Sequence, residues 1–342
     1  MSSYLIAGTI TDSDGSPAER IVRVYNREIG GLIGETTSDP TTGYYEIESF
    51  VQQEVQRIVL DSATGDPIFN DIVDRIITSY AGEFSTGGGA WDVSTASYSG
   101  SIALNDIDSG GIDFSPNGLK MYTVGYGNDR VYEYSLATAW DVTTAYFVQS
   151  LSVINVEPTV RGVRFRPDGV KMYIVGNGAD KVSEHNLSEA WNISTSSFVR
   201  SFYVGTQDSS PCDVFFRPDG LVFYVAGYGA DGVNAYNLLT AWELTSVSHI
   251  SFFSTASNEA SPRSVFFRPD GLIMYVCGTG GDAVVEYELG EAWDITTSTY
   301  VRTKIVSAAE SRPQGVFLRS DGLKMYVTGD TSNRAHQYDL GS

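Results

Sequence analysis

Short runs of alternating apolar and polar residues recur along most of the chain at a fixed interval. Each unit begins with a turn: "SPNG" at 115–118, "RPDG" at 166–169, 217–220 and 268–271, and "RSDG" at 319–322, a spacing of 51 residues throughout. Then come an apolar run such as "KMYIV", a glycine-rich turn, a run such as "RVYEYSL", a segment such as "AWDVTT" and a further run such as "SFVRSFYV". Runs of this length, bounded by Gly, Pro, Asp and Asn, predict four short strands per unit.

A four-stranded unit repeated every 51 residues is typical of a β-propeller blade. Five tryptophans in the "AW" segments mark the units: Trp91, Trp140, Trp191, Trp242 and Trp293. The repeat region opens late in one unit and stops early in another, so the stretch 97–104 is expected to complete the blade whose other strands end at Leu340. This closure leaves no sheet edge exposed. We therefore predict a five-bladed β-propeller over residues 91–342.

Residues 1–80 do not share the repeat. The alternating runs "YLIAGTI", "IVRVYNRE", "LIGETT", "YYEIES" and "VQRIVLD", separated by turn segments, predict a small antiparallel β-sandwich. The glycine-rich residues 81–90 are predicted to be a linker. The expected fold class is all-β: a small antiparallel β-sandwich followed by a five-bladed propeller with four strands per blade, closed by the N-terminal strand of the repeat region.

Charge and composition exclude several classes of protein. The formal net charge of −20 and the lack of a basic stripe argue against nucleic-acid binding. The two cysteines, Cys212 and Cys277, follow no metal-binding or disulfide spacing. The N-terminus lacks the features of a signal peptide, and no apolar run approaches the roughly 20 residues of a membrane span. Membrane insertion is therefore not expected.

The loops that precede each first strand are the candidate binding site. These loops, such as "NVEPTVRG" at 155–162 and "SAAESRPQG" at 307–315, differ at nearly every position, whereas the turns on the opposite face barely change. Loops on a fixed scaffold often carry function, although drift in solvated loops explains the variation equally well. The candidate ligand-binding residues are Asp108, Glu157, Arg161, Asp208, Glu259, Arg263, Glu310 and Arg312.

Glycine-rich turns on the same face place one acidic residue in each of four blades. In "GYGND", "GNGAD", "GYGAD" and "GTGGD" these residues are Asp129, Asp180, Asp231 and Asp282. The favoured interpretation is that each aspartate accepts hydrogen bonds from its own turn. A ring of Ca²⁺ sites is the alternative, and Ca²⁺ is the one cofactor that the sequence leaves open.

No catalytic motif stands out. The three histidines lie at different registers of different blades, and neither GxSxG nor HExxH is present. Asp113 and Asp213 are acids at or beside the inner strands of two adjacent blades, and a glycan-cleaving propeller would need such a pair. The protein is not expected to be an enzyme, and no catalytic residues are assigned.

Two segments resemble known families. Residues 7–47, "AGTITDSDGSPAERIVRVYNREIGGLIGETTSDPTTGYYEI", resemble the transthyretin-like or carboxypeptidase-regulatory-like β-sandwich. Residues 55–78 resemble the ending that this module has in many bacteriophage structural proteins. The blades, with "PDG-x-KMY-x-VG" and "AWD-[IV]-[ST]-T", resemble propeller repeats of phage and bacterial surface proteins. The resemblance implies a bacteriophage virion protein of the tail-fibre, head-fibre or decoration type.

From this resemblance we expect a virion surface protein, present in multiple copies and assembled in the host cytoplasm. Residues 1–80 would anchor it to other virion structural proteins, and the propeller would bind host-surface glycan or protein. Two alternatives stay open. One is a purely structural decoration or fibre component without a ligand, and the other is a glycan-cleaving propeller enzyme.

Overall fold

The computed structural model describes residues 89–341 in full and, before them, the backbone of seven strands. The chain divides into two compact units, Met1–Gly87 and Gly88–Ser342. Most of the predicted linker at 81–90 lies outside the described residues. None of the helical segments that the structure describes has the length and apolar character that a membrane span requires.

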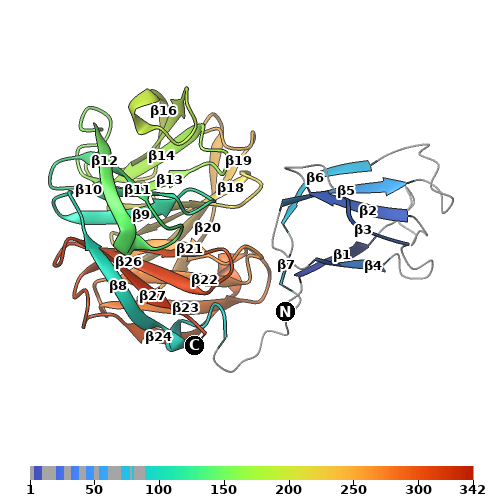
Figure 1. Cartoon of the computed structure of the whole chain (residues 1–342). Helices are drawn as coiled ribbons and strands as arrows, with labels where there is room; N and C mark the ends of the chain where they lie inside the picture. The colour runs from blue at the N-terminus through green and yellow to red at the C-terminus, as the bar shows by residue number, and fades with distance from the viewer. Residues whose placement is uncertain are drawn as a thin grey trace. The chain divides into compact units, whose positions relative to one another are not determined.

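The first unit contains two antiparallel sheets, with strand orders β4-β1-β7 and β3-β2-β5-β6 (Figure 1). Its strands are β1 (Tyr4–Thr9), β2 (Ile21–Asn26), β3 (Leu32–Thr37), β4 (Tyr44–Ser49), β5 (Glu54–Leu60), β6 (Asp71–Ile77) and β7 (Ser79–Tyr80). The alternating runs at the start of the chain therefore form strands, as predicted.

The second unit is a propeller of five four-stranded antiparallel sheets, which confirms the predicted fold class. Blade 1 contains β9 (Ser109–Phe114), β10 (Lys120–Gly125), β11 (Arg130–Leu136) and β12 (Ala145–Ser152). Blade 2 contains β13 (Val160–Phe165), β14 (Lys171–Gly176), β15 (Lys181–Leu187) and β16 (Ser196–Tyr203). Blade 3 contains β17 (Pro211–Phe216), β18 (Val222–Gly227), β19 (Gly232–Leu238) and β20 (Val247–Ser254). Blade 4 contains β21 (Pro262–Phe267), β22 (Ile273–Gly278), β23 (Ala283–Leu289) and β24 (Ser298–Ile305).

Blade 5 is assembled from both ends of the repeat region. Its first three strands are β25 (Pro313–Leu318), β26 (Lys324–Gly329) and β27 (Arg334–Asp339), and the fourth is β8 (Ser97–Ala103). β8 pairs antiparallel with β27, from Arg334 opposite Ala103 to Asp339 opposite Ser97. Figure 1 shows β8 beside the red strands of blade 5. The predicted closure is therefore confirmed.

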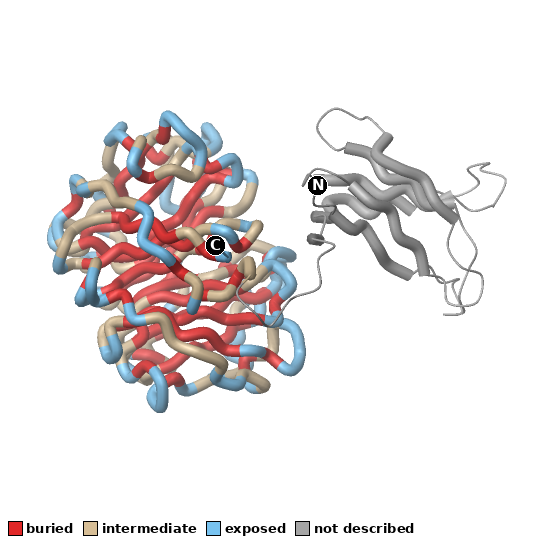
Figure 2. The backbone as a smooth tube through the Cα atoms, turned by 60° about the horizontal axis from the view of Figure 1, so that its bottom comes forward, coloured by how far each residue is buried: buried red, intermediate tan, exposed pale blue. Residues whose placement is uncertain are grey.

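The core lies between neighbouring blades. All six residues of β9 are buried, whereas only the first of the eight residues of the outer strand β12 is buried. In Figure 2 the inner strands are continuous buried segments, and exposure concentrates on the loops and outer strands. Strands covered on both faces by adjacent sheets must be apolar along their whole length, which explains runs such as "FYVAG".

A repeated hydrogen bond joins each blade to the next. The second strand of every blade carries a buried tyrosine whose hydroxyl donates to the backbone carbonyl of the "AW" tryptophan in the following blade, at 2.6–2.7 Å. The pairs are Tyr122 to Trp191, Tyr173 to Trp242, Tyr224 to Trp293, Tyr275 to Trp91 and Tyr326 to Trp140. The recurrent tyrosine and tryptophan therefore belong to the architecture of the ring.

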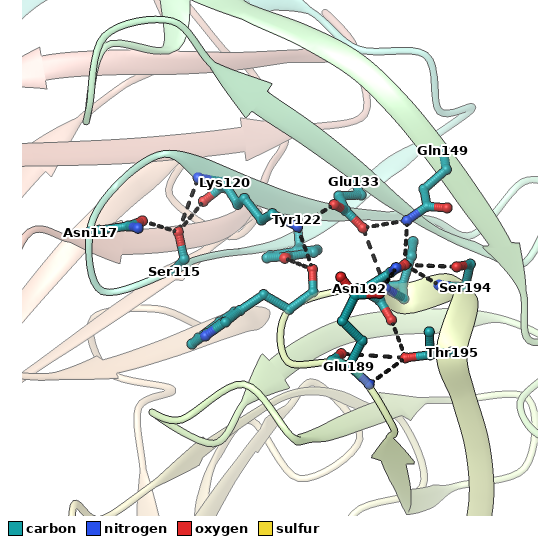
Figure 3. A network of polar contacts seen from close by, with 12 residues as sticks. Ser115, Asn117, Lys120, Tyr122, Glu133, Gln149, Glu189, Asn192, Ser194 and Thr195 are labelled. Carbon is teal, nitrogen blue, oxygen red and sulfur yellow. Dashed lines mark hydrogen bonds and ion pairs between the residues drawn. The ribbon is translucent and has the colours of Figure 1, made fainter.

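Figure 3 shows the polar contacts around the joint between blades 1 and 2. The Glu133 carboxylate accepts hydrogen bonds from Lys120 Nζ and Gln149 Nε2, both at 2.8 Å. It also accepts the backbone N–H of Ile193 in blade 2 at 3.3 Å. Glu133 is only 2% exposed, and these donors offset the cost of burying its charge.

Candidate functional site

The variable loops surround one end of the inner strands, which contact one another in a ring. The second residue of the inner strand is Gly, Arg, Cys, Arg and Gln in blades 1 to 5, and each turn between the second and third strands adds a further variable residue. Seven of these residues are linked side by side, and we call them the mouth ring: Gln314, Asp330, Tyr126, Arg161, Asn177, Tyr228 and Arg263.

The first part of the mouth ring joins blades 5, 1 and 2. Gln314 Nε2 donates to Asp330 Oδ2 at 3.0 Å, and the Tyr126 hydroxyl donates to the same oxygen. The Arg161 guanidinium carbon lies 3.7 Å from the centre of the Tyr126 ring. Burial and the neighbouring Asp330 raise the pKa of Tyr126, so its phenol stays neutral and acts as a donor.

The second part continues through blades 2, 3 and 4. Arg161 Nε donates to Asn177 Oδ1 at 3.2 Å, and Asn177 Nδ2 donates to the Tyr228 hydroxyl at 2.7 Å. The Arg263 guanidinium carbon lies 3.8 Å from the centre of the Tyr228 ring. Stacking on an aromatic face fixes the plane of a guanidinium while its edge stays available for hydrogen bonds.

The mouth ring therefore presents two oriented cations on a protein of net charge −20. Arg161 and Arg263 are each partly buried, and the terminal nitrogens of Arg161 form no hydrogen bond with any residue that the structure describes. Arg312 lies outside the ring, where its Nε is 3.2 Å from Asp330 Oδ1 and its side chain is 58% exposed. Such donors suit an anion or an oxygen that becomes negative during a reaction.

Asp108 lies beside this arrangement. Its backbone is left-handed, with φ of 57°, and it precedes the inner strand of blade 1. A Cβ built on Gly127, the residue after Tyr126, would lie only 2.7 Å from Asp108 Oδ2. The residue is partly exposed, and its carboxylate has no hydrogen-bond partner within residues 89–341. A carboxylate and a guanidinium thus flank the Tyr126 turn.

The other four predicted binding acids are buried at 0–1% exposure and point into their own blades. Each accepts backbone N–H groups from the turn between the second and third strands, at 2.7–3.3 Å. These acids are Glu157, Asp208, Glu259 and Glu310. Burial raises the pKa of Glu157 to about 7. The structure therefore uses these carboxylates to hold the turns, and it brings only Asp108 and the three arginines to the mouth.

The aspartates of the glycine-rich turns also have a structural position. Asp129, Asp180, Asp231 and Asp282 have left-handed backbones, with φ between 50° and 55°. Their backbone carbonyls accept the N–H that follows the outer strand, at 2.9–3.0 Å. Within the part of the chain that the structure describes, no group of three or more His, Cys, Asp or Glu residues could hold a metal ion.

Asp113 and Asp213 form an ion-pair network instead of an open carboxylate pair. The expectation that they lie in adjacent blades is wrong, because Arg164 of blade 2 stands between them at 3.3 Å from Asp113 and 3.6 Å from Asp213. Each carboxylate also accepts a backbone N–H from the neighbouring blade, Phe165 at 2.8 Å and Val265 at 3.2 Å. Exposures of 4% and 2% leave no access for a glycan chain.

Cys212 is the second residue of the inner strand of blade 3, close to Arg263. Its sulfur lies 3.8 Å from Arg263 Nη1, yet burial raises the pKa of the thiol to about 11. A thiol with this pKa is protonated at neutral pH and is a poor nucleophile. The Cys212 thiol is therefore not a candidate nucleophile.

Sequence reasoning missed five members of the mouth ring. One is Gln314, in the inner strand of blade 5. The other four, Tyr126, Asn177, Tyr228 and Asp330, occupy one position of the glycine-rich turn. At this position the five blades read Tyr, Asn, Tyr, Thr and Asp, at the regular 51-residue spacing. The variation was the available signal, because the glycine before this position is retained in all five blades and the glycine after it in four.

Comparison with known proteins places the chain among the propellers. A family model described as lactonase, 7-bladed beta-propeller, matches residues 111–299, more than half of the chain. The match begins in the inner strand of blade 1 and ends in the outer strand of blade 4, and this chain has five blades where the family description names seven. No sequence among curated proteins matches.

Solved structures give distant matches. A protein from Lactobacillus plantarum is 11% identical, with a TM-score of 0.45 and coverage of 94% of this chain and 92% of its own. A Bacteroides uniformis protein, provisionally assigned as a 6-phosphogluconolactonase, is 13% identical, with a TM-score of 0.43 and coverage of 99% and 92%. A protein from Bacteroides fragilis with the same provisional assignment is 14% identical, with a TM-score of 0.42 and coverage of 96% and 92%.

The family match overturns the prediction of a bacteriophage virion protein. Four expectations fall with that prediction and are wrong: that the protein is not an enzyme, that residues 1–80 bind virion structural proteins, that the propeller binds host-surface glycan or protein, and that the virion is its location. The enzyme alternative is closer to the finding than the adhesin or the purely structural component. The resemblance of residues 7–78 to a sandwich family rests on side chains that lie outside the described residues, so it stays a prediction.

Proposed function

The chain belongs to the lactonase family of β-propellers, and from this premise we propose that it is an enzyme that hydrolyses lactones at the mouth ring. A lactone is a cyclic ester. Its hydrolysis requires a water molecule that loses a proton and a donor that stabilises the carbonyl oxygen as that oxygen becomes negative.

The observation that carries the proposal is the position of Arg161. Its guanidinium is stacked on Tyr126, and its Nε donates a hydrogen bond to Asn177. These two contacts hold the plane of the guanidinium, and with it the terminal nitrogens, at the mouth. A donor fixed before the reaction stabilises a developing oxyanion without reorganising. Arg161 is therefore the group that we assign to the carbonyl oxygen.

Asp108 is the group that we assign to the water. Its carboxylate lies next to the Tyr126 turn and is not engaged by a described residue. In the proposed reaction Asp108 accepts a proton from the water as the water oxygen bonds to the carbonyl carbon. The bond between that carbon and the ring oxygen then breaks, and the ring oxygen takes the proton from Asp108. The product is one hydroxy acid per lactone and water consumed, and it ionises at neutral pH.

Arg263 offers a second cation across the ring, stacked on Tyr228 in the same manner as Arg161 on Tyr126. Its Nη2 is 3.4 Å from Ser261 Oγ, which orients the guanidinium. We assign Arg263 to hydroxyl or anionic substituents of the substrate and to the carboxylate of the product.

The test is a titration of the acid released from a panel of lactones, including δ-valerolactone and sugar lactones, at constant pH. Arg161→Ala should lower kcat by about 10²–10³-fold, because it removes an oxyanion donor. Asp108→Asn should lower kcat by about 10²–10⁴-fold, because it removes the general base.

Arg217→Ala is the matched control. Arg217 pairs with the exposed Asp219 at 2.7 Å, in a turn at the opposite end of the strands. This variant should keep the wild-type rate. A wild-type protein that does not exceed the spontaneous rate with any lactone, or equal loss of activity in Arg217→Ala, would contradict the proposal.

A further inference from the structure

A cavity of about 210 Å³ lies at the outer part of blade 2, away from the mouth ring. It is bounded by the end of β12 and the loop after it, by β15 and by β16. The lining residues are Leu151, Ser152, Val153, Asn155, Val156, His185, Ser196 and Phe198. Ser152, Asn155 and Phe198 are exposed, so the cavity opens to solvent.

His185 is the residue that makes blade 2 differ from the other blades. The equivalent position holds a tyrosine in each of the other blades, all buried at 0–4% exposure: Tyr134, Tyr236, Tyr287 and Tyr338. His185 is equally buried, at 4%. Its ring meets Phe198 edge-on with centroids 5.7 Å apart, just as Tyr134 meets Phe147 at 6.0 Å. The imidazole therefore stands where a phenol ring stands in the other blades.

Blade 1 shows what the phenol does at this position. The Tyr134 hydroxyl reaches the loop before β9 and accepts the backbone N–H of Asn105 at 2.7 Å. Imidazole is shorter than phenol and carries no hydroxyl, so His185 does not fill the same space below the loop before β13. The cavity between His185, Val153 and Val156 is the result.

The imidazole also has an unused hydrogen-bonding atom. Nδ1 lies 3.1 Å from Ser196 Oγ, but Nε2 is buried and has no partner among residues 89–341. Burial lowers the pKa of His185 to about 4, so the ring is neutral at pH 7. A neutral imidazole has one donor and one acceptor nitrogen, and a hydroxyl group can satisfy either.

We propose that the His185 cavity is a second ligand site, which binds a small neutral molecule with a hydroxyl group on an apolar ring, such as phenol. The hydroxyl bonds to His185 Nε2, and the ring packs against Val153, Val156 and Phe198. An apolar cavity of about 150 Å³ accommodates benzene in another protein, so a cavity of this size holds a single substituted ring. The site is independent of the proposed lactone chemistry.

The direct test adds increasing amounts of the full chain to 4-fluorophenol and measures the linewidth of the ¹⁹F NMR signal of the probe. The linewidth should increase with protein concentration and reach a plateau. Fluorobenzene has the same ring without the hydroxyl and should bind at least about tenfold more weakly, because it leaves Nε2 unpaired. Equal binding of the two probes would overturn the assignment of Nε2.

Three variants test whether the probe binds in this cavity and not elsewhere on the protein. His185→Tyr restores the residue of the other blades and should abolish saturable binding while the fold is retained. Val156→Phe fills the cavity from the opposite wall and should have the same effect. Tyr236→His should create an equivalent cavity in blade 3 and raise the number of bound probes from one to two.

Arg161→Ala is the control at the mouth ring and should leave the 4-fluorophenol titration unchanged. Loss of binding in this variant, or unchanged binding in His185→Tyr, would place the probe elsewhere and overturn the proposal. Thermal melts followed by circular dichroism establish that each variant is folded. Because lactone hydrolysis is assayed separately, failure of one proposal leaves the other standing.

Discussion

At the scale of single residues, the tryptophan and the turn glycine of each blade determine each other's conformation. All five tryptophans have left-handed backbones, with φ of 64–72°, and their backbone N–H groups donate to the carbonyls of the turn glycines at 2.8–2.9 Å. The glycines have φ of 69–76°. A Cβ on any of them would lie 2.2–2.4 Å from the tryptophan ring. The glycine of Pro-Asp-Gly is thus required both by its backbone and by the ring above it.

We expect Gly220→Ala to lower the free energy of unfolding by about 2–5 kcal/mol, because it combines a left-handed alanine with overpacking against a ring. The added Cβ would lie 2.2 Å from Trp242 Nε1 at φ of +71°. Urea denaturation measures the difference. Gly281→Ala is the control, since its nearest neighbour would be 3.6 Å away, in ordinary contact. Equal midpoints for the two variants would contradict this account.

At the scale of elements, β8 decides whether the ring has an edge. It supplies the outer strand of blade 5 and pairs with β27 along the whole length of that strand. Without β8, the N–H and C=O groups of β27 would be free on one side. An unpaired strand edge is a template for association with another chain.

Two truncations test this role. Residues 88–342 retain β8 and should give a monomer with a single cooperative melt. Residues 105–342 lack β8 and should associate or melt at a lower temperature. Size-exclusion chromatography with light scattering distinguishes the two states. Monomers with the same melting temperature from both fragments would show that the closing strand is dispensable.

At the scale of the whole molecule, stability should depend on pH through buried carboxyl groups. Burial raises the pKa of Asp106 and Asp113 to about 6 and of Glu157 and Glu286 to about 7. The folded state therefore keeps these protons to a higher pH than the unfolded state. Their contribution to stability is full below about pH 4 and is lost as the pH rises toward 7.

Two buried histidines act in the opposite direction. Burial lowers the pKa of His185 to about 4 and also lowers that of His336, so their contribution is lost as the pH falls below about 6.5. The carboxyl groups are more numerous, and the net charge of −20 adds repulsion at high pH. We expect the melting temperature to rise between pH 8 and pH 5.

Glu286→Gln tests how much one of these carboxyl groups contributes to the pH dependence of stability. Gln337 occupies the equivalent position in blade 5 and accepts the Val142 N–H at 3.1 Å, so glutamine fits this joint. The variant should show a smaller loss of melting temperature between pH 5 and pH 8 than the wild type, because it has no proton to lose. Glu288→Gln, on the exposed side of the same strand, should keep the wild-type profile. Identical profiles for Glu286→Gln and wild type would contradict the assignment.

The sequence was a sufficient guide to the blades but an insufficient guide to the site. Arg161, Arg263 and Arg312 were chosen from their loops and do lie at the mouth. Glu157 was chosen from the same loop as Arg161, yet it is fully buried against its own turn. The two residues are four positions apart in the sequence, but the side chain of Glu157 is buried in its blade and that of Arg161 lies at the mouth. No local sequence pattern distinguishes these two environments.

The repeat alone determined the number of blades, the four strands of each and the closing role of β8. Turn chemistry and strand patterning are local, and a 51-residue period leaves only one way to close the sheets. Tertiary structure alone decided which polar residues meet. The Tyr126–Arg161 and Tyr228–Arg263 pairs and the His185 cavity depend on how one blade packs on the next, because their members lie on different blades or beneath a neighbouring loop.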